Sequence, residues 1–174
     1  MNIKYVEGDL FKAVESKTSP VVIPHVCNDK GGWGAGFVLP LSRHYPLAEE
    51  AYRNWASARP GSFIPFWMGQ TQIVRMEQNP LVVVANMVAQ TLGGERPLHY
   101  NHLATCMNTV AENARVEARE IMCPMFGAGL AGGDWNFIEQ LIVDAWVRED
   151  IPVTVFYLPG MLPKNWTLPS EVDT

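Results

Sequence analysis

The sequence is short of charged residues, of cysteine and of long apolar runs, and each shortage excludes a class of protein. Charged residues form 18% of the 174 positions, against roughly 25% in an average soluble domain, which excludes a disordered tail or a highly charged scaffold. Thirteen Lys and Arg stand against 18 Asp and Glu, for a net charge of −5. A globally basic surface is therefore excluded, and nucleic acid is not expected as a partner.

The three cysteines, Cys27, Cys106 and Cys123, match no CxxC pair, zinc ribbon or disulfide framework. We interpret them as reduced thiols. The sequence contains no Asp/His cluster with metal-ligand spacing, so neither a metal nor a cofactor is expected. It also has no basic leader followed by an apolar stretch, and no run approaches the roughly 18 apolar residues that span a bilayer. These features predict a cytoplasmic protein without a membrane partner.

Length and a hydrophobic content of 48% predict one domain over residues 1–174. Short β-branched runs alternate with helical patterns, which indicates an α/β sandwich. Strands are expected at 2–6, 21–23, 81–88, 120–126 and 153–158, and helices at 10–15, 34–58 (divided near Tyr45 and Pro46), 101–119 and 135–148. Pro24 is expected to end the ladder of its strand, and residues 64–76 to form a hairpin that turns near Gly69 and Gln70.

Ten of the 14 glycines fall into three clusters. They are Gly31, Gly32, Gly34 and Gly36; Gly93 and Gly94; and Gly127, Gly129, Gly132 and Gly133. The first and third clusters each follow an expected strand and open an expected helix, where backbone N–H groups can converge on an anion. Tight turns are the alternative reading. Neither cluster has P-loop spacing, and the first lacks GxGxxG spacing, so neither of those nucleotide motifs is predicted.

Four segments in this order resemble the signatures of macro domains, which are ADP-ribose-binding modules. They are Val6-Glu7-Gly8-Asp9-Leu10, His25-Val26-Cys27-Asn28, Trp33-Gly34-Ala35-Gly36 and Pro124-Met125-Phe126-Gly127-Ala128-Gly129-Leu130. The second and third, with Arg43 to Glu49, are most similar to the ADP-ribose-1″-phosphate phosphatase group, a neighbour of the ADP-ribosyl-glutamate hydrolases. The resemblance spans essentially the whole chain. It implies a three-layer α/β/α sandwich with a central mixed sheet.

The resemblance also implies a ligand, ADP-ribose or ADP-ribose 1″-phosphate, and residues that bind it. Asp9 would accept a hydrogen bond from adenine or cap a helix, and Phe156 would flank adenine or belong to the core. The backbone of 126–130 would bind the diphosphate, while Asn28 and residues 34–37 would surround the distal ribose. The implied substrate-binding residues are Asp9, Leu10, Trp33, Gly34, Ala35, Gly36, Phe37, Phe126, Gly127, Ala128, Gly129, Leu130 and Phe156.

Two residues are the catalytic candidates. His25 could donate a proton to the departing ribose oxygen or orient a water near neutral pH, and Asn28 could position the ribose. A buried core histidine is the alternative for His25. Cys27 is not favoured as a nucleophile, because its place at the strand end predicts burial.

Three further residues have two readings each. Asp134 is a base or a helix cap, Lys30 assists the phosphate or is solvated, and Trp33 closes over the ribose or packs.

The chain departs from the deacylating relatives in two places. They use a lysine where Asn86 to Thr91 contains none, and an aspartate where Ala131 stands, so hydrolysis of glutamyl esters by that route is not predicted. The leading hypothesis is hydrolysis of the terminal phosphate of ADP-ribose 1″-phosphate. A reader that binds ADP-ribose without turnover, and an ADP-ribosyl hydrolase acting on protein or nucleic-acid conjugates, remain alternatives. Nothing in the sequence indicates an oligomeric state.

Overall fold

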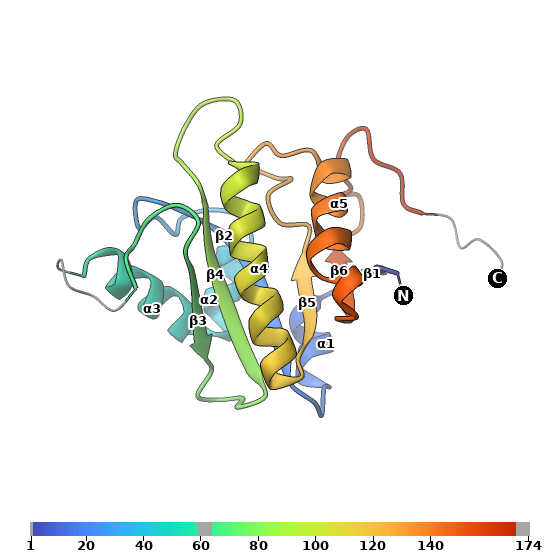
Figure 1. Cartoon of the computed structure of the whole chain (residues 1–174), viewed down its shortest axis with the longest axis horizontal. Coiled ribbons are helices and arrows are strands. Elements are labelled where there is room, and N and C mark those ends of the chain that lie inside the picture. The colour runs from blue at the N-terminus through green and yellow to red at the C-terminus, as the bar shows by residue number, and fades with distance from the viewer. Residues whose placement is uncertain (1, 59–63, 170–174) are drawn as a thin grey trace.

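A computed structural model describes residues 2–58 and 64–169, so positions 1, 59–63 and 170–174 of the expected domain lie outside the described residues. Its centre is a six-stranded sheet in the order β1-β6-β5-β2-β4-β3 (Figure 1). The strands are β1 (Lys4–Glu7), β2 (Val21–Asn28), β3 (Thr71–Arg75), β4 (Val82–Gln90), β5 (Glu120–Pro124) and β6 (Val153–Tyr157). All neighbours pair in parallel except β3, which is antiparallel to β4. The sheet is therefore mixed, as expected.

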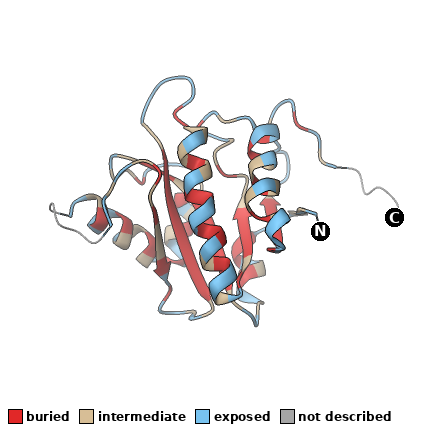
Figure 2. Cartoon of the chain, in the orientation of Figure 1, coloured by how far each residue is buried: buried red, intermediate tan, exposed pale blue. Residues whose placement is uncertain are grey.

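Helices cover both faces of the sheet and complete the three layers. They are α1 (Leu10–Glu15), α2 (Val38–His44), α3 (Pro46–Ala56), α4 (Tyr100–Glu117) and α5 (Trp135–Ala145), with a short 3₁₀ turn at Val147–Glu149. One core lies under α4 and α5, and the other under α1, α2 and α3. Figure 2 shows the buried residues along the strands and on the sheet-facing sides of the helices. Among the described residues, no helix has the length and apolar character required to cross a membrane.

Several helix boundaries follow directly from local chemistry. Asp9 and Asp134 cap α1 and α5, since each carboxylate accepts a backbone N–H two residues on. Pro46 begins α3 because its fixed φ suits the first helical position and disfavours helix in the preceding Tyr45. The predicted division between α2 and α3 is thus confirmed. The first of these helices starts at Val38 rather than Gly34, after Gly36 adopts a φ of +79°.

The prediction that Pro24 ends its ladder is wrong. β2 continues to Asn28, and Pro24 itself is in register with Ala85 of β4. Pairing of β2 with β5 contains only Val21 and Val22. Pro24, which has no N–H to donate, thus lies just beyond the end of the ladder with β5, while pairing with β4 continues past it in register to Cys27.

The hairpin expected over 64–76 is also wrong. Only Thr71–Arg75 of that segment is a strand, and its antiparallel partner is β4. Gly69 and Gln70 lie before the strand, where the Gly69 N–H donates to the Val88 carbonyl. The chain therefore reverses after β3, near residues 76–81, because β4 offers a longer buried strand than residues 64–70.

Candidate functional site

A cavity of about 360 Å³ lies where β2 and β4 reach their carboxyl ends. Ligands of open α/β sheets bind at this edge. The cavity is lined by Val26, Cys27, Asn28, Gly32, Trp33, Gly34, Ala35, Val38, Gln90, Thr91, Leu92, Gly93, Pro97 and Leu130. A second hollow of about 380 Å³ includes Pro20, Glu120 and Pro152 near the opposite strand ends, and its lining contains none of the clustered glycines. The first cavity is therefore the candidate site.

Asn28 organises the first glycine loop. Its Oδ1 accepts the N–H groups of Lys30 and Gly32 at 2.9 and 3.0 Å, and its Nδ2 donates to the Gly32 carbonyl at 2.9 Å. The Tyr52 hydroxyl donates to the Asn28 carbonyl at 2.5 Å. A Cβ at Gly32 would lie 2.9 Å from the Asn28 amide nitrogen, so this close approach requires glycine. The geometry assigns Asn28 to holding the loop.

Two runs of backbone N–H groups are free to meet an anion. Within the described residues, the backbone N–H groups of 33–37 and of 126–131 donate no hydrogen bond. β2 and β5, which precede these two loops, are neighbours in the sheet. A Cβ at Gly36 would lie 3.6 Å from the Leu130 side chain, so the loops meet beside the cavity. This arrangement suits a diphosphate held by main-chain donors.

His25 lies behind the cavity and is not part of its lining. Its side chain is 2% exposed, and its Nε2 is 2.5 Å from Asn86 Oδ1. The Asn86 Nδ2 donates to the Ala48 carbonyl and to Gln72 Oε1, so Asn86 Oδ1 is the acceptor and His25 Nε2 carries the proton. The buried Nδ1 has no partner within the described residues.

Burial lowers the pKa of His25 to about 4, and the hydrogen bond from Nε2 to Asn86 opposes this shift. The imidazole is therefore neutral near pH 7. Among the described residues His25 is buried and is not one of those that line the cavity. The acid/base role expected for His25 does not fit this position, because the strand continues past His25 and Trp33 packs edge-on against its ring at 5.2 Å.

Cys27 is the titratable side chain among the described residues that line the cavity. Burial raises the pKa of its thiol well above the ordinary value. Its Sγ lies 3.8 Å from His25 Nε2, but that nitrogen already donates to Asn86. Cys27 is thus a protonated thiol, in keeping with the expectation that it is no nucleophile.

The aromatic candidates lie deeper than the resemblance implied. The Trp33 indole donates to the Val38 carbonyl at 3.1 Å and to Ser42 Oγ at 2.5 Å, which favours its packing role over a mobile cover. Phe156 is 7% exposed and belongs to the core under α1 to α3, as does Leu10. The Phe126 ring packs against Trp135 and Trp146, so only its backbone faces the loop.

The polar candidates divide into helix caps and surface residues. Asp9 Oδ1 accepts the Phe11 N–H at 2.9 Å, and the residue is exposed, so its second oxygen is accessible to a ligand. Asp134 Oδ1 accepts the Asn136 N–H at 2.9 Å, which confirms the cap and leaves its role as a base without support. Lys30 is exposed and does not line the cavity.

Sequence reasoning missed the end of β4 and the segment that follows it. Gln90, Thr91, Leu92, Gly93 and Pro97 all line the cavity. A signal was present, because Leu92-Gly93-Gly94 directly follows the longest apolar strand, and residues after a central strand lie at the same sheet edge as the other glycine loops. The second glycine cluster therefore belongs to the site as well.

Comparison with known proteins decides the family. No protein-family model matches the chain. The solved structure of a macrodomain protein from Streptomyces coelicolor is 41% identical, with a TM-score of 0.76, and the match covers 90% of this chain and 99% of that one. The chain belongs to the macro domain family.

Two further relatives of this macro domain are a phosphatase sequence and a ligand-bound structure. The ADP-ribose 1″-phosphate phosphatase of Saccharomyces cerevisiae (strain YJM789) is 39% identical, over 90% of this chain and 99% of that protein. Other phosphatases of the same name are matched over 27% to 92% of their length. The structure of Thermosipho africanus DarTG in complex with ADP-ribose is 17% identical with a TM-score of 0.72, over 97% of this chain and 43% of that one, and it shows a shared fold.

Proposed function

We propose that this macro domain binds ADP-ribose derivatives and hydrolyses the terminal phosphate of ADP-ribose 1″-phosphate. The observation that supports it most is the pair of unpaired N–H runs, 33–37 and 126–131, beside one cavity. The 39% identity to a phosphatase of that name supports the choice of substrate. Main-chain donors also explain how a protein of net charge −5 binds an anion.

In this proposal the two loops bind different parts of the ligand. Residues 126–130 bind the diphosphate, and residues 34–37, held by Asn28, surround the distal ribose and its phosphate. Asp9 and Phe156 lie toward adenine, with Leu10 beneath them. Trp33 and Asn28 maintain the shape of the cavity through their own hydrogen bonds. His25 is a positioning residue that supports Trp33 from behind.

The reaction is hydrolysis of a phosphomonoester. Water attacks phosphorus, the bond from phosphorus to the 1″-oxygen breaks, and a water proton passes to the departing oxygen. The products are ADP-ribose and inorganic phosphate. Because Cys27 is the titratable lining residue in the described part of the chain, the protein contributes mainly N–H donors that stabilise developing negative charge.

A second candidate is a reader that binds ADP-ribose without turnover. The cavity lining contains no histidine or carboxylate among the described residues, which favours this candidate. Removal of ADP-ribose from protein or nucleic-acid conjugates lacks a comparable observation, since Ala131 and the segment 86–91 offer no acid or lysine.

We propose one domain over residues 1–174 that acts on a small molecule in the cytoplasm without a cofactor. The three free, buried cysteines support a reducing compartment.

The test compares binding and turnover in the same preparation. Calorimetry with ADP-ribose and phosphate release from ADP-ribose 1″-phosphate are measured for the wild-type protein and Gly34→Val. The proposal predicts phosphate release by the wild type and its loss in the variant. Binding without release would select the reader, and release of label from ADP-ribosylated conjugates would select the third hypothesis. Failure to bind ADP-ribose would overturn all three.

A further inference from the structure

Gln90 lines the cavity, and its side-chain amide makes no hydrogen bond within the described residues. It is the last residue of β4, in register with Asn28 across a bulge, and it lines the cavity. The register shift makes Ala89 an extra residue between Val88 and Gln90, so the end of β4 departs from regular alternation beside the cavity. Gln90 thus ends the strand in the lining of the cavity, together with Cys27 and Asn28.

Hydrogen bonding distinguishes Gln90 from the other amide of the cavity. The Asn28 amide is engaged with Lys30, Gly32 and Tyr52. The Gln90 backbone carbonyl accepts the Asp29 N–H, but within residues 2–58 and 64–169 the Gln90 side chain makes no hydrogen bond. A polar side chain that faces a cavity without a protein partner is available to a ligand.

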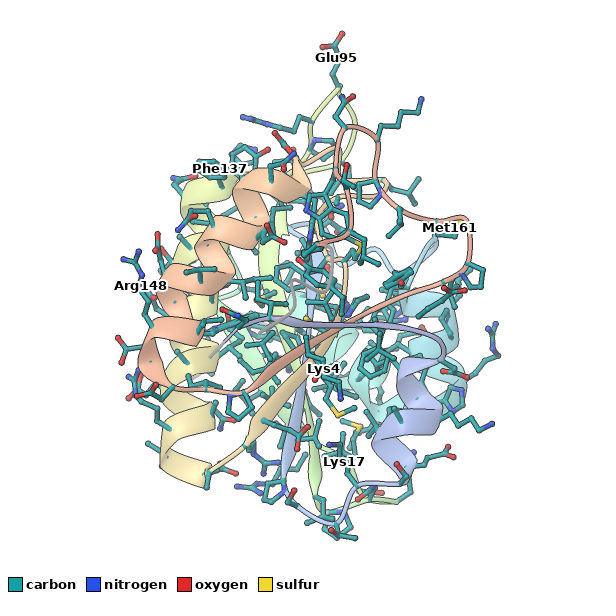
Figure 3. The ribbon with its side chains drawn as sticks, turned by 90° about the vertical axis from the view of Figure 1, so that its right-hand side faces the viewer. Lys4, Lys17, Glu95, Phe137, Arg148 and Met161 are labelled. Carbon is teal, nitrogen blue, oxygen red and sulfur yellow. The ribbon has the colours of Figure 1, made fainter. Side chains whose placement is uncertain are left out.

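The backbone at Gln90 is held in place from both sides. Gln90 bridges Leu98, the Thr91 N–H donates to the Pro97 carbonyl at 3.0 Å, and the Leu98 N–H donates to the Ala131 carbonyl at 3.1 Å. These bonds close the base of the β4–α4 loop, whose tip bears Glu95 and projects beyond the sheet edge (Figure 3). The amide thus starts from a fixed backbone, which suits selective recognition.

The charge around this amide indicates which group it takes. Among the described residues that line the cavity, none bears a formal charge near pH 7, because Cys27 is protonated. A phosphoryl group entering here meets only neutral donors. The Gln90 amide nitrogen carries two N–H donors, and Gly34 and Ala35 line the same cavity.

We infer that the Gln90 side-chain amide binds the phosphoryl group on the distal ribose, and so distinguishes ADP-ribose 1″-phosphate from ADP-ribose. The identity of this ligand rests on the proposed function. The inference adds a specificity-determining residue that makes direct contact with the substrate. A carboxylate at the same position would repel the phosphate, and ADP-ribose itself would be little affected.

The experiment measures dissociation constants for both ligands by calorimetry in wild type, Gln90→Glu and Gln90→Leu. Gln140→Glu is the matched control, since it makes the same charge change on the exposed face of α5. We expect Gln90→Glu to weaken binding of the 1″-phosphate by about tenfold or more, as for the loss of a hydrogen bond to a charged group. We expect ADP-ribose binding to stay within about threefold, well under the tenfold that 1.4 kcal/mol represents. Gln90→Leu should lose the preference without adding a charge.

The outcomes separate this inference from the proposed function. An unchanged ratio of the two dissociation constants in Gln90→Glu and Gln90→Leu overturns the inference, even if the wild type releases phosphate. A lost preference in a wild-type background that releases no phosphate supports the inference and overturns the phosphatase proposal. A wild-type protein that binds ADP-ribose but not its 1″-phosphate overturns both. Thermal unfolding of each variant identifies one that does not fold, and the other Gln90 variant then decides.

Discussion

The Nε2 atom of His25 donates to Oδ1 of Asn86 across a distance of 2.5 Å, between neighbouring strands in the centre of the sheet. The same Asn86 amide donates to the Ala48 carbonyl and to Gln72, so a chain of polar groups runs through the core beneath the cavity. Buried amides with all partners in place specify one arrangement of the core. The histidine is held there as a neutral donor.

His25 makes stability depend on pH. Its pKa is about 4 in the folded protein against an ordinary value of 6.5, so the unfolded chain binds more protons between these values. Stability from this residue is complete above about pH 6.5 and falls toward pH 4, by roughly 3 kcal/mol. Urea unfolding at several pH values should show this loss in the wild type and a smaller one in His25→Gln. Identical pH dependence in both proteins would contradict the prediction.

Replacing Gly34 should weaken ligand binding without destabilising the fold. Its φ lies outside the left-handed region, and a Cβ there meets no atom within 4 Å. Gly34→Val should change the free energy of unfolding by no more than about 0.5 kcal/mol, as for a surface substitution. The valine fills space in front of the N–H groups of 33–37, so ADP-ribose binding should weaken by about tenfold or more, which 1.4 kcal/mol of steric cost suffices to produce. Calorimetry that gives wild-type affinity would refute this.

Replacing Gly133 should destabilise the fold, in contrast to replacing Gly34, because the neighbouring atoms leave no room for a Cβ. A Cβ would lie 2.5 Å from the Gly127 carbonyl oxygen and 2.5 Å from the Leu98 side chain. Gly133→Ala should therefore destabilise the fold by about 1–3 kcal/mol and also weaken ADP-ribose binding, since the 127–133 loop must move. Gly129→Ala is the control, as its Cβ meets nothing within 4 Å. Equal melting temperatures of the two variants would argue against the close approach.

Tyr52 connects α3 to the first glycine loop. Its buried hydroxyl donates to the Asn28 carbonyl at 2.5 Å. Tyr52→Phe leaves that carbonyl without this donor, so we expect a loss of about 1–3 kcal/mol in stability and weaker ligand binding. In Tyr157→Phe the lost hydroxyl has no hydrogen bond within the described residues, so the unfolding free energy should change less. Chemical denaturation of both variants tests the difference.

The thiols should be unreactive in the folded protein. All three cysteines are buried, and burial raises the pKa of Cys106 to about 11. A disulfide reagent at about pH 8 should label none of them until denaturant exposes them. Cys27 lines the cavity, so any slow labelling at this residue should decrease further with saturating ADP-ribose. Rapid labelling without denaturant would show that the cavity is more open than described.

Much of the fold could be predicted because its signals are local. The β-branched runs of β2 and β4, the caps Asp9 and Asp134, and the break at Pro46 each depend on residues within a few positions. The hairpin predicted over residues 64–76 was wrong for the opposite reason. Apolar residues lie on both sides of Gly69 and Gln70 and suit two strands, and only the presence of β4 determines which part is paired.

The positions of the backbone loops of the site could be predicted from the sequence, but the surroundings of its side chains could not. The glycine loops after β2 and β5 lie where the clusters indicated, since small residues at strand ends permit close approach of main chain and ligand. The sequence left two interpretations of His25, catalytic and buried, and Gln90 was not singled out. Whether a polar side chain faces a cavity or the core depends on the register between strands and on what packs above it.

The sequence by itself determined most of the strands, the beginnings of α1, α3 and α5, and three loops rich in glycine, because these properties follow from covalent geometry and nearest neighbours. Tertiary structure alone decided that β5 lies beside β2, which brings two loops distant in sequence to one cavity. It also decided that His25 is buried and neutral and that Gln90 lines the cavity. Burial and hydrogen-bond partners come from residues far along the chain, so no local pattern contains them.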